Sequence, residues 1–298
     1  MVGITHIGEP RPLEIIAAAN TLGEGVLWDG ATQSLWWTDI EGRQLHRFDW
    51  THRTMQLIDT PERLGSFGLV AGSDQLITAF ASGIALYDPS RQQVQWLARP
   101  DAHLRHLRFN DGRVDRQGRF WTGTLSEDGG NPLRASLYSL TRGELHRQLT
   151  DVRISNGLCF SPDGSQGYFA DSPTRIVRSF QVPPPAGRAK QWREFARTHA
   201  HGEPDGACVD SEGHVWSAQW GGGCVVRFTP AGAVDRILRV PVSQPTCVCF
   251  GGPDLDLLFV SSARQGLSAE QLAREPFAGD IFVYQLGSRG LPESQYLP

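Results

Sequence analysis

The chain has 298 residues, of which 40% are hydrophobic and 20% are charged, a balance typical of water-soluble globular proteins. A net charge of -4 and a pI near 6.1 argue against nucleic-acid or anionic-membrane partners. No apolar run approaches the roughly 20 residues needed to cross a bilayer. The first residues, Met1–Glu9, lack the basic segment and apolar core of a secretory signal, so a cytoplasmic location is expected.

A short pattern recurs six times: a polar or special residue, an apolar stretch, a turn marked by Asp, Gly or Ser, and a second apolar strand. The turns follow one another at roughly 41 to 49 residues, the blade-length period of propeller arrays. The apolar stretches are short, β-branched or aromatic, and bounded by turn formers, as strands require. In chain order the copies are headed by Glu24, Phe67, Asn110, Asn156, Asp205 and Thr246.

Further strands are predicted after every turn. The second strand of each copy is expected at residues 34–39, 75–80, 118–123, 167–171, 214–218 and 256–261. A third alternating strand is expected at 44–49, 136–140, 176–180 and 223–228. No helical period is sustained over a dozen residues, and the best short helix is Ser268–Arg274, which Pro276 stops.

The two ends of the chain are predicted to close the ring. The last strand, Gly279–Leu286, would leave its blade one strand short, and the N-terminal run Leu13–Ala19 can supply the missing strand. A ring closed in this way has no exposed sheet edge. The sequence therefore predicts an all-β fold, a six-bladed β-propeller forming a single domain over residues 1–298, with its N-terminal strand in the last blade.

The residues that head the copies are expected to face one central channel, because the first strand of each propeller blade runs beside the axis. Two carboxylates and two amides there would be costly to bury unless a bound cation satisfied them. All-oxygen ligands favour a hard cation such as Ca²⁺, Mg²⁺ or Mn²⁺. The alternative is that these residues only form turns, where Asn-Gly and Asp-Gly pairs are common. Their shared register over several repeats favours a metal site.

Other reactive side chains are expected to play smaller roles. The five cysteines lack metal-binding spacing and lie in apolar runs, so buried positions are predicted. The single lysine, Lys190, follows a proline-rich loop and offers no centre for Schiff-base chemistry. His199 and His201 precede Asp205 and are candidates for a metal ligand or a pocket wall. The nine tryptophans are expected mainly in the cores between blades.

Five segments, in order along nearly the whole chain, carry a family resemblance: Leu22–Asp29, Arg108–Asp115, Ser155–Leu158, Pro204–Gly206 and Gln244–Gly252. Together they resemble the senescence marker protein 30, gluconolactonase and regucalcin family. The resemblance implies a six-bladed propeller that hydrolyses sugar lactones with one divalent cation in its channel. Calcium is the first expectation for that cation, with magnesium, manganese, zinc or iron as alternatives.

The resemblance also implies roles for single residues. Glu24, Asn156 and Asp205 correspond to the metal ligands, in agreement with their shared register. The cation would act as a Lewis acid on the lactone carbonyl, and Asp205 would be the general base that activates a water.

Substrate contacts are expected from a second group of residues. Arg108 and Asn110 match the pair that holds the substrate in the family, and the planar guanidinium suits that task. Family members often carry a substrate-contacting acid after a segment that corresponds to 123–126. Here Glu127 and Asp128 both follow that segment, and either can take the place.

Three functions remain open on the sequence. The first is an aldonolactonase in carbohydrate catabolism, acting on a small sugar lactone as a monomer or weak homo-oligomer. The second is a non-catalytic calcium-binding propeller with a regulatory or interaction role, because a fold alone does not fix a function. The third is an esterase or phosphotriesterase for less polar substrates. Arg108 beside Asn110 favours the first, because a pure cation binder needs no guanidinium there.

Overall fold

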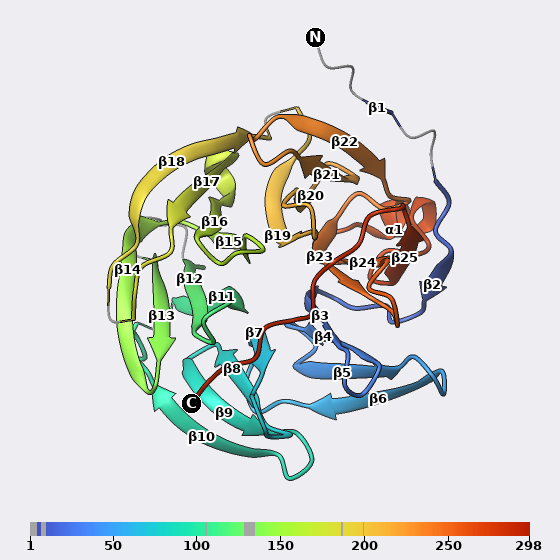
Figure 1. Cartoon of the computed structure of the whole chain (residues 1–298). Coiled ribbons are helices and arrows are strands. Elements are labelled where there is room, and N and C mark those ends of the chain that lie inside the picture. Colours follow the sequence, from blue (N-terminus) through green and yellow to red (C-terminus); the bar gives the residue numbers. More distant parts are fainter. Residues whose placement is uncertain (1–4, 7–9, 105, 128–134, 186, 199) are drawn as a thin grey trace.

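The protein is described by a computed structural model covering residues 5–6, 10–104, 106–127, 135–185, 187–198 and 200–298. Six β-sheets are arranged around a central axis like the blades of a propeller (Figure 1). The predicted six-bladed β-propeller is confirmed. Within each blade, consecutive strands pair antiparallel, and the first strand lies nearest the axis (Figure 1).

The strand bounds follow the predicted repeat closely. The first three blades contain β3 (Gly23–Asp29), β4 (Ser34–Asp39), β5 (Gln44–Asp49) and β6 (Thr54–Asp59); β7 (Leu64–Leu69), β8 (Leu76–Phe80), β9 (Gly83–Asp88) and β10 (Gln93–Ala98); and β11 (Leu107–Val114), β12 (Phe120–Ser126), β13 (Ala135–Thr141) and β14 (Glu144–Val152). The next two contain β15 (Ser155–Phe160), β16 (Gln166–Asp171), β17 (Ile176–Gln181) and β18 (Lys190–Arg197); and β19 (Glu203–Val209), β20 (Val215–Trp220), β21 (Cys224–Phe228) and β22 (Val234–Arg239). A short 3-10 helix, η1 (Ser172–Thr174), links β16 to β17.

The last blade combines the two ends of the chain, as predicted. It contains β23 (Pro245–Gly251), β24 (Leu257–Ser262) and β25 (Ile281–Gln285), and its outer strand is β2 (Glu14–Ile16). Helix α1 (Ala269–Arg274) interrupts this blade between β24 and β25, and the Ser268 side chain caps its first turn, so the predicted helix is confirmed. A further strand, β1 (Thr5–His6), pairs parallel with β22 and was not predicted.

The outer strands β6, β10, β14, β18 and β22 also escaped prediction. They lie at the rim of the ring, where most of their side chains reach solvent. A strand with little buried surface carries only a weak hydrophobic alternation, which is the main signal for a strand in a sequence.

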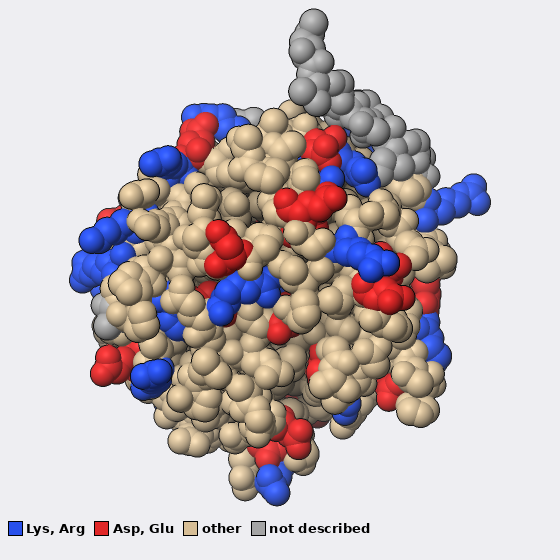
Figure 2. Space-filling view, viewed as in Figure 1, with Lys and Arg blue, Asp and Glu red and all other residues tan. Residues whose placement is uncertain are grey.

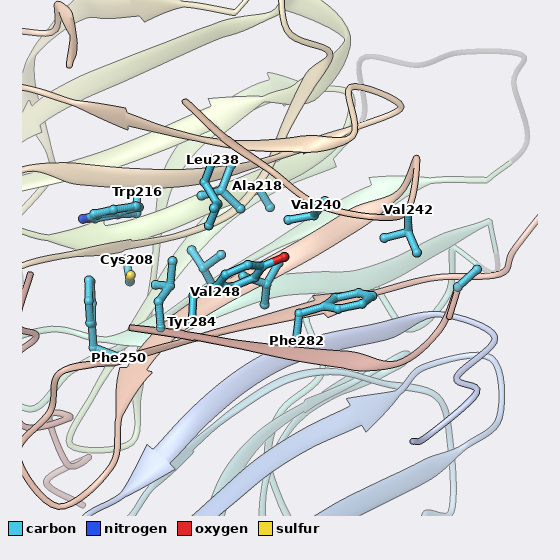
Figure 3. Close-up of a cluster of buried hydrophobic side chains, with 14 residues drawn as sticks. Cys208, Trp216, Ala218, Leu238, Val240, Val242, Val248, Phe250, Phe282 and Tyr284 are labelled. Atoms are coloured by element: carbon cyan, nitrogen blue, oxygen red, sulfur yellow. The ribbon is translucent and has the colours of Figure 1, made fainter. Parts of the chain in front are cut away.

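The hydrophobic core lies between the blades. Each interface between neighbouring blades holds one cluster of buried side chains from both. Figure 3 shows the cluster between the fifth and sixth blades, where Trp216 and Leu238 face Val248 and Phe282. Trp28, Trp37 and Trp121 are likewise fully buried in such interfaces, and all five cysteines are buried and unpaired. These placements confirm the predicted packing roles.

Each inner strand carries a one-residue bulge near its N-terminal end. In β3, Glu24 pairs with Thr38 whereas Leu27 pairs with Trp36, so three steps on the inner strand face two on its neighbour. The same offset occurs in β11, β15, β19 and β23, and β7 carries its shift slightly earlier. A bulge bends its strand and re-aims a side chain. In five blades it falls at the residue that heads the repeat.

A C-terminal segment, residues 287–298, crosses the centre of the ring on the face seen in Figure 1. Its backbone bonds to the sixth blade through Gly290, and to the second and third through Tyr296 and Leu297. Glu293 accepts two hydrogen bonds from Arg113, which rises from β11 beside the axis. A cavity of only about 30 Å³ remains beside this pair, room for about one water molecule.

On the face seen in Figure 2, basic and acidic side chains are intermixed. Among the described residues, no helix has both the length and the apolar character needed to span a membrane.

The ion pair of Arg113 and Glu293 gives a prediction about stability. Both side chains are largely buried, so replacing Glu293 with Ala leaves the Arg113 charge without its partner. We expect E293A to lower the free energy of unfolding by about 3 kcal/mol. Urea denaturation measures this loss. In the control E270A, which removes an exposed ion pair on α1, the loss should stay below about 0.5 kcal/mol. Equal small effects in both variants would contradict a stabilising role for the C-terminal segment.

Candidate active site

A cavity of about 260 Å³ opens at the end of the ring where the inner strands begin. Glu24, Arg108, Asn110, Asn156 and Asp205 all line it. They come from four inner strands, β3, β11, β15 and β19. Residues far apart in the sequence are therefore gathered at one point, as the common register predicted. The volume lies near the small end of the range for ligand pockets and suits a compact ligand.

Two carboxyl groups meet in this cavity. The side chains of Glu24 and Asp205 are hydrogen-bonded to each other, and both residues are buried. Burial and then the nearby Asp111 carboxylate raise the pKa of Glu24 to about 8. Burial and then the charge of Glu24 raise the pKa of Asp205 well above its usual value. Without a cation the pair therefore holds a proton near neutral pH.

A third carboxyl group, Asp111, lies close behind the pair and was not predicted as a site residue. Its oxygens accept hydrogen bonds from the backbone N–H of Gly112 and of Leu158, each at 2.8 Å. Gly157, which precedes Leu158, has a φ of +66° that favours glycine, so Asp111 clamps the bulge of β15 directly after Asn156. Burial raises the pKa of Asp111. The side chain is placed to hold two inner strands together.

The two predicted amides are linked in one chain of hydrogen bonds. Asn110 Nδ2 donates to Asn156 Oδ1 at 2.9 Å, and Asn156 Nδ2 donates to Ser172 Oγ at 2.9 Å. Ser172 Oγ in turn donates to the carbonyl of Pro204 at 2.7 Å, next to Asp205. The chain fixes the amide orientations across three blades. The Asn156 side chain is thereby held in the cavity that the two carboxyl groups also line.

Arg108 is buried and firmly held. Its Nη1 donates to Asn110 Oδ1 at 2.7 Å and to the carbonyl of Phe109 at 3.1 Å. Its Nε donates to Glu127 Oε1 at 3.2 Å. Desolvation lowers the pKa of Arg108, yet guanidinium groups stay charged at neutral pH. A fixed positive charge therefore stands in the wall beside the carboxyl pair.

Glu127 connects Arg108 to a second arginine that was not predicted. Arg63 donates two hydrogen bonds to the Glu127 carboxylate, at 2.7 and 2.8 Å, and one to Glu41 at 3.2 Å. These contacts lower the pKa of Glu127, with the Arg63 hydrogen bond as the largest cause. Asp128, the other candidate for this position, lies outside the described residues.

Two of the six register positions do not offer ligands. Phe67 is buried in the core between the first and second blades, and its ring lies against the backbone of Gly25. The Thr246 hydroxyl donates to the carbonyl of Gly23 and pairs with Ser261. These two blades therefore contribute packing and backbone support rather than polar groups to the cavity.

Several lining residues were missed by the sequence. Glu203 and Trp220 line the cavity from the fifth blade, and Gln265 lines it from the loop after β24. None of the three heads a repeat, and Trp220 was grouped with the core tryptophans. His199 lies outside the described residues, and His201 is not among the described lining side chains.

The chemistry of the carboxyl pair and Asn156 fits a divalent cation. Three oxygen-bearing side chains from different blades are buried together, and two of them are carboxyl groups whose pKa is raised. Such a set is stabilised when a cation replaces the shared proton, and oxygen donors suit a hard ion. Glu24, Asn156 and Asp205 are therefore the residues that could hold one.

A second acidic group in the described chain, formed by Asp210, Glu212 and His214, is spaced closely enough for a metal. Arg227 Nη2 already donates to Asp210 Oδ2 at 2.6 Å and to Glu212 Oε2 at 2.9 Å. The guanidinium supplies the positive charge there. The third blade repeats this arrangement, with Arg119 donating to Asp115 at 2.6 Å. The arrangement is structural.

Residues 22–264 match the family described as the SMP-30/Gluconolactonase/LRE-like region. The chain belongs to this family. A 6-deoxy-6-sulfogluconolactonase from Pseudomonas putida is 39% identical over 94% of this chain and 96% of its own length. An L-arabinolactonase from Azospirillum brasilense is 39% identical over 93% of this chain and 92% of its own length. The crystal structure of a calcium-binding protein, regucalcin, from Agrobacterium tumefaciens matches the whole of both chains with a TM-score of 0.92 and 28% identity.

The carboxyl pair gives a pH-dependence prediction for the cation-free protein. The pKa of Glu24 is raised from 4.5 to about 8 on folding, so its contribution to stability is full below pH 4.5 and is lost as the pH rises through 8. We expect the free energy of unfolding to fall by roughly 2 kcal/mol between pH 6 and pH 8.5. Urea denaturation in the presence of a chelator measures this change.

In the double variant E24Q/D205N the same pH interval should change stability much less, because both carboxyl groups with a raised pKa are gone. Adding Ca²⁺ to the unmodified protein at pH 8.5 should restore the lost stability, since only the folded state gathers the ligands. A cation-free protein that becomes more stable at pH 8.5 than at pH 6 would contradict this account.

Proposed function

We propose that the protein is a divalent-cation-dependent hydrolase that opens a sugar lactone to its aldonic acid in carbohydrate catabolism. The observation that carries the proposal is the shared cavity: an all-oxygen ligand set and a fixed guanidinium line the same small space. The two lactonases that are 39% identical to this chain act on sugar lactones by name, which supports the same reaction class.

A divalent cation held by Glu24, Asn156 and Asp205 would keep both carboxyl groups ionised and polarise the lactone carbonyl. Calcium is the first candidate, because its ligands are typically carboxylate, amide and water oxygens. The calcium-binding regucalcin with a similar structure is consistent with that choice. Magnesium, manganese, zinc and iron are the alternatives.

Asp205 is proposed as the general base. Its carboxylate would accept a proton from the water whose oxygen attacks the carbonyl carbon. The bond between that carbon and the ring oxygen then breaks, and the proton passes to the ring oxygen, which becomes a hydroxyl of the acid. Water is the co-substrate, and no oxidant or reductant is required.

Arg108, Asn110 and Glu127 are proposed to hold the substrate. Arg108 would donate to oxygens of the lactone, and its planar group is already oriented by Asn110 and Glu127. Arg63 keeps Glu127 in place through two hydrogen bonds. Asp128 stays a candidate for a substrate contact beside Glu127.

The competing function is a non-catalytic calcium-binding module. The calcium-binding protein of similar structure is consistent with it. Such a module gives no reason to bury Arg108 beside the ligand set. An assay over a panel of aldonolactones separates the two. The cation-stripped protein is supplied with each divalent ion in turn, and acid release is followed with a pH indicator. Cation-dependent acid release on at least one lactone is expected, whereas cation binding without turnover on any lactone would favour the module.

Asp205 provides the sharpest prediction for the chemistry. D205A should lower kcat at least about 1,000-fold, because it removes the proposed base and a cation ligand together. The matched control is Asp235→Ala on the outer strand β22, which should keep the rate of the unmodified protein. Steady-state kinetics at saturating cation measures both. A D205A variant with near-full turnover would remove this residue from the reaction.

A further inference from the structure

The cavity has a second wall, built by the fifth blade. Glu203 and Trp220 are directly paired in the register of β19 and β20, so their side chains lie on the same face of the sheet. Both line the cavity. The turn that follows Trp220 is packed tightly: a Cβ on Gly222 would lie 1.5 Å from the carbonyl oxygen of His201. The turn after Trp220 is thus packed closely against the backbone of His201.

This wall faces the site from a different side than Arg108. Arg108 belongs to the third blade, Glu203 and Trp220 belong to the fifth, and the fourth blade stands between them in the ring (Figure 1). Asp205 lies two residues after Glu203 on the same inner strand. A ligand that reaches both Arg108 and Asp205 therefore extends toward Glu203 and Trp220.

The two side chains offer complementary chemistry. An indole presents a broad apolar face with a single N–H donor, which suits the C–H face of a sugar. A carboxylate accepts hydrogen bonds from hydroxyl groups. Arg175 Nη2 is 3.9 Å from Glu203 Oε1, longer than a hydrogen bond, and the Glu203 side chain is 35% exposed. Its oxygens are therefore accessible to ligand hydroxyls.

The charges of the lining disfavour an anionic ligand. Among the described lining residues Arg108 is the only cationic side chain; its Nε and Nη1 donate to Glu127, Phe109 and Asn110, and in the proposed function its guanidinium also holds oxygens of the lactone. A sulfonate or phosphate on a substrate whose lactone oxygens contact Arg108 would find no second cationic side chain among the described lining residues and would approach the Glu203 carboxylate, whose neighbour Arg175 lies outside that lining. We expect repulsion between this anionic group and the Glu203 carboxylate to lower the affinity for the ligand about tenfold.

We propose that Glu203 and Trp220 bind the hydroxyl-bearing carbons of an uncharged aldonolactone, and that Glu203 discriminates against lactones that carry a sulfonate or phosphate. This inference rests on the proposed lactonase function. It separates this chain from one of its two relatives of equal identity, because one is named for a sulfonated gluconolactone and the other for an arabinolactone.

Glu203 is tested by comparing kcat/KM on three probes: glucono-1,5-lactone, 6-phosphogluconolactone and 6-deoxy-6-sulfogluconolactone. The unmodified protein should prefer the uncharged lactone at least about tenfold. E203Q removes the charge and keeps an oxygen acceptor, so the preference should shrink at least threefold. The control E194Q makes the same change of net charge on the exposed outer strand β18 and should keep the preference.

Trp220 is tested with a pair of variants. W220A should raise KM for glucono-1,5-lactone about tenfold with little change in kcat, because a binding contact is lost equally in ground and transition states. W220F keeps an aromatic face and should recover most of the lost affinity. Circular dichroism and titration with Ca²⁺ check that both variants fold and bind the cation normally. Should W220A fail to fold, W220F and W220L carry the comparison.

The outcomes separate this inference from the proposed function. A protein that hydrolyses the phosphorylated or sulfonated lactone as well as the uncharged one overturns the discrimination by Glu203. An unchanged preference in E203Q does the same. A fall in kcat at constant KM in W220A would place Trp220 in the chemical step instead. Absence of turnover on every lactone with every cation would overturn the lactonase function itself, and this inference with it.

Discussion

The geometry of the site depends on holding two carboxyl groups, Glu24 and Asp205, within hydrogen-bonding distance of each other inside the ring. Burial opposes this arrangement, and nearby negative charges add to this opposition, that of Asp111 on Glu24 and that of Glu24 on Asp205; the raised pKa values of both groups follow from these two effects. The scaffold that overcomes them consists of six sheets packed around the axis, with a hydrophobic cluster in every interface. A rigid ring can keep repelling groups together because no single blade can relax without opening two interfaces.

The bulges of the inner strands convert this scaffold into a site. An extra residue at the start of the strand turns the side chain that heads the repeat toward the axis. The repeats differ in the type of side chain at this head position. Four blades present carboxyl or amide groups, whereas Phe67 and Thr246 serve packing and backbone hydrogen bonding. One repeated structural device thus yields an asymmetric set of ligands.

The fold and the centre of the site are predictable from the sequence because both are repeated. The spacing of the turns indicates the blades, and the common register groups six positions, of which Glu24, Asn110, Asn156 and Asp205 line the cavity; the choice of Glu24, Asn156 and Asp205 as ligands came from the family resemblance. Features outside the repeat are not predictable in the same way. Asp111 acts on a neighbouring blade through the backbone of Leu158, a contact that no local pattern encodes.

The walls of the cavity are harder to predict than its centre. Trp220 has the residue type and strand position of a core tryptophan, and only its place at the last position of β20 exposes it to the cavity. Arg63 belongs to the loop before β7 and reaches Glu127 in the next blade. Long side chains from loops can reach many partners, so their contacts depend on the assembled structure rather than on spacing in the chain.

The C-terminal segment crosses the end of the ring axis that lies opposite the cavity. Tyr296 and the pair of Arg113 and Glu293 occupy the end opposite the cavity. In the proposed function the ion, the sugar lactone and water would enter through the same opening of the cavity, and the product would leave through it. Under the proposed reaction the departing acid is an anion that must pass Glu203 at the rim. The same carboxylate that screens arriving molecules would then hasten the departure of the product.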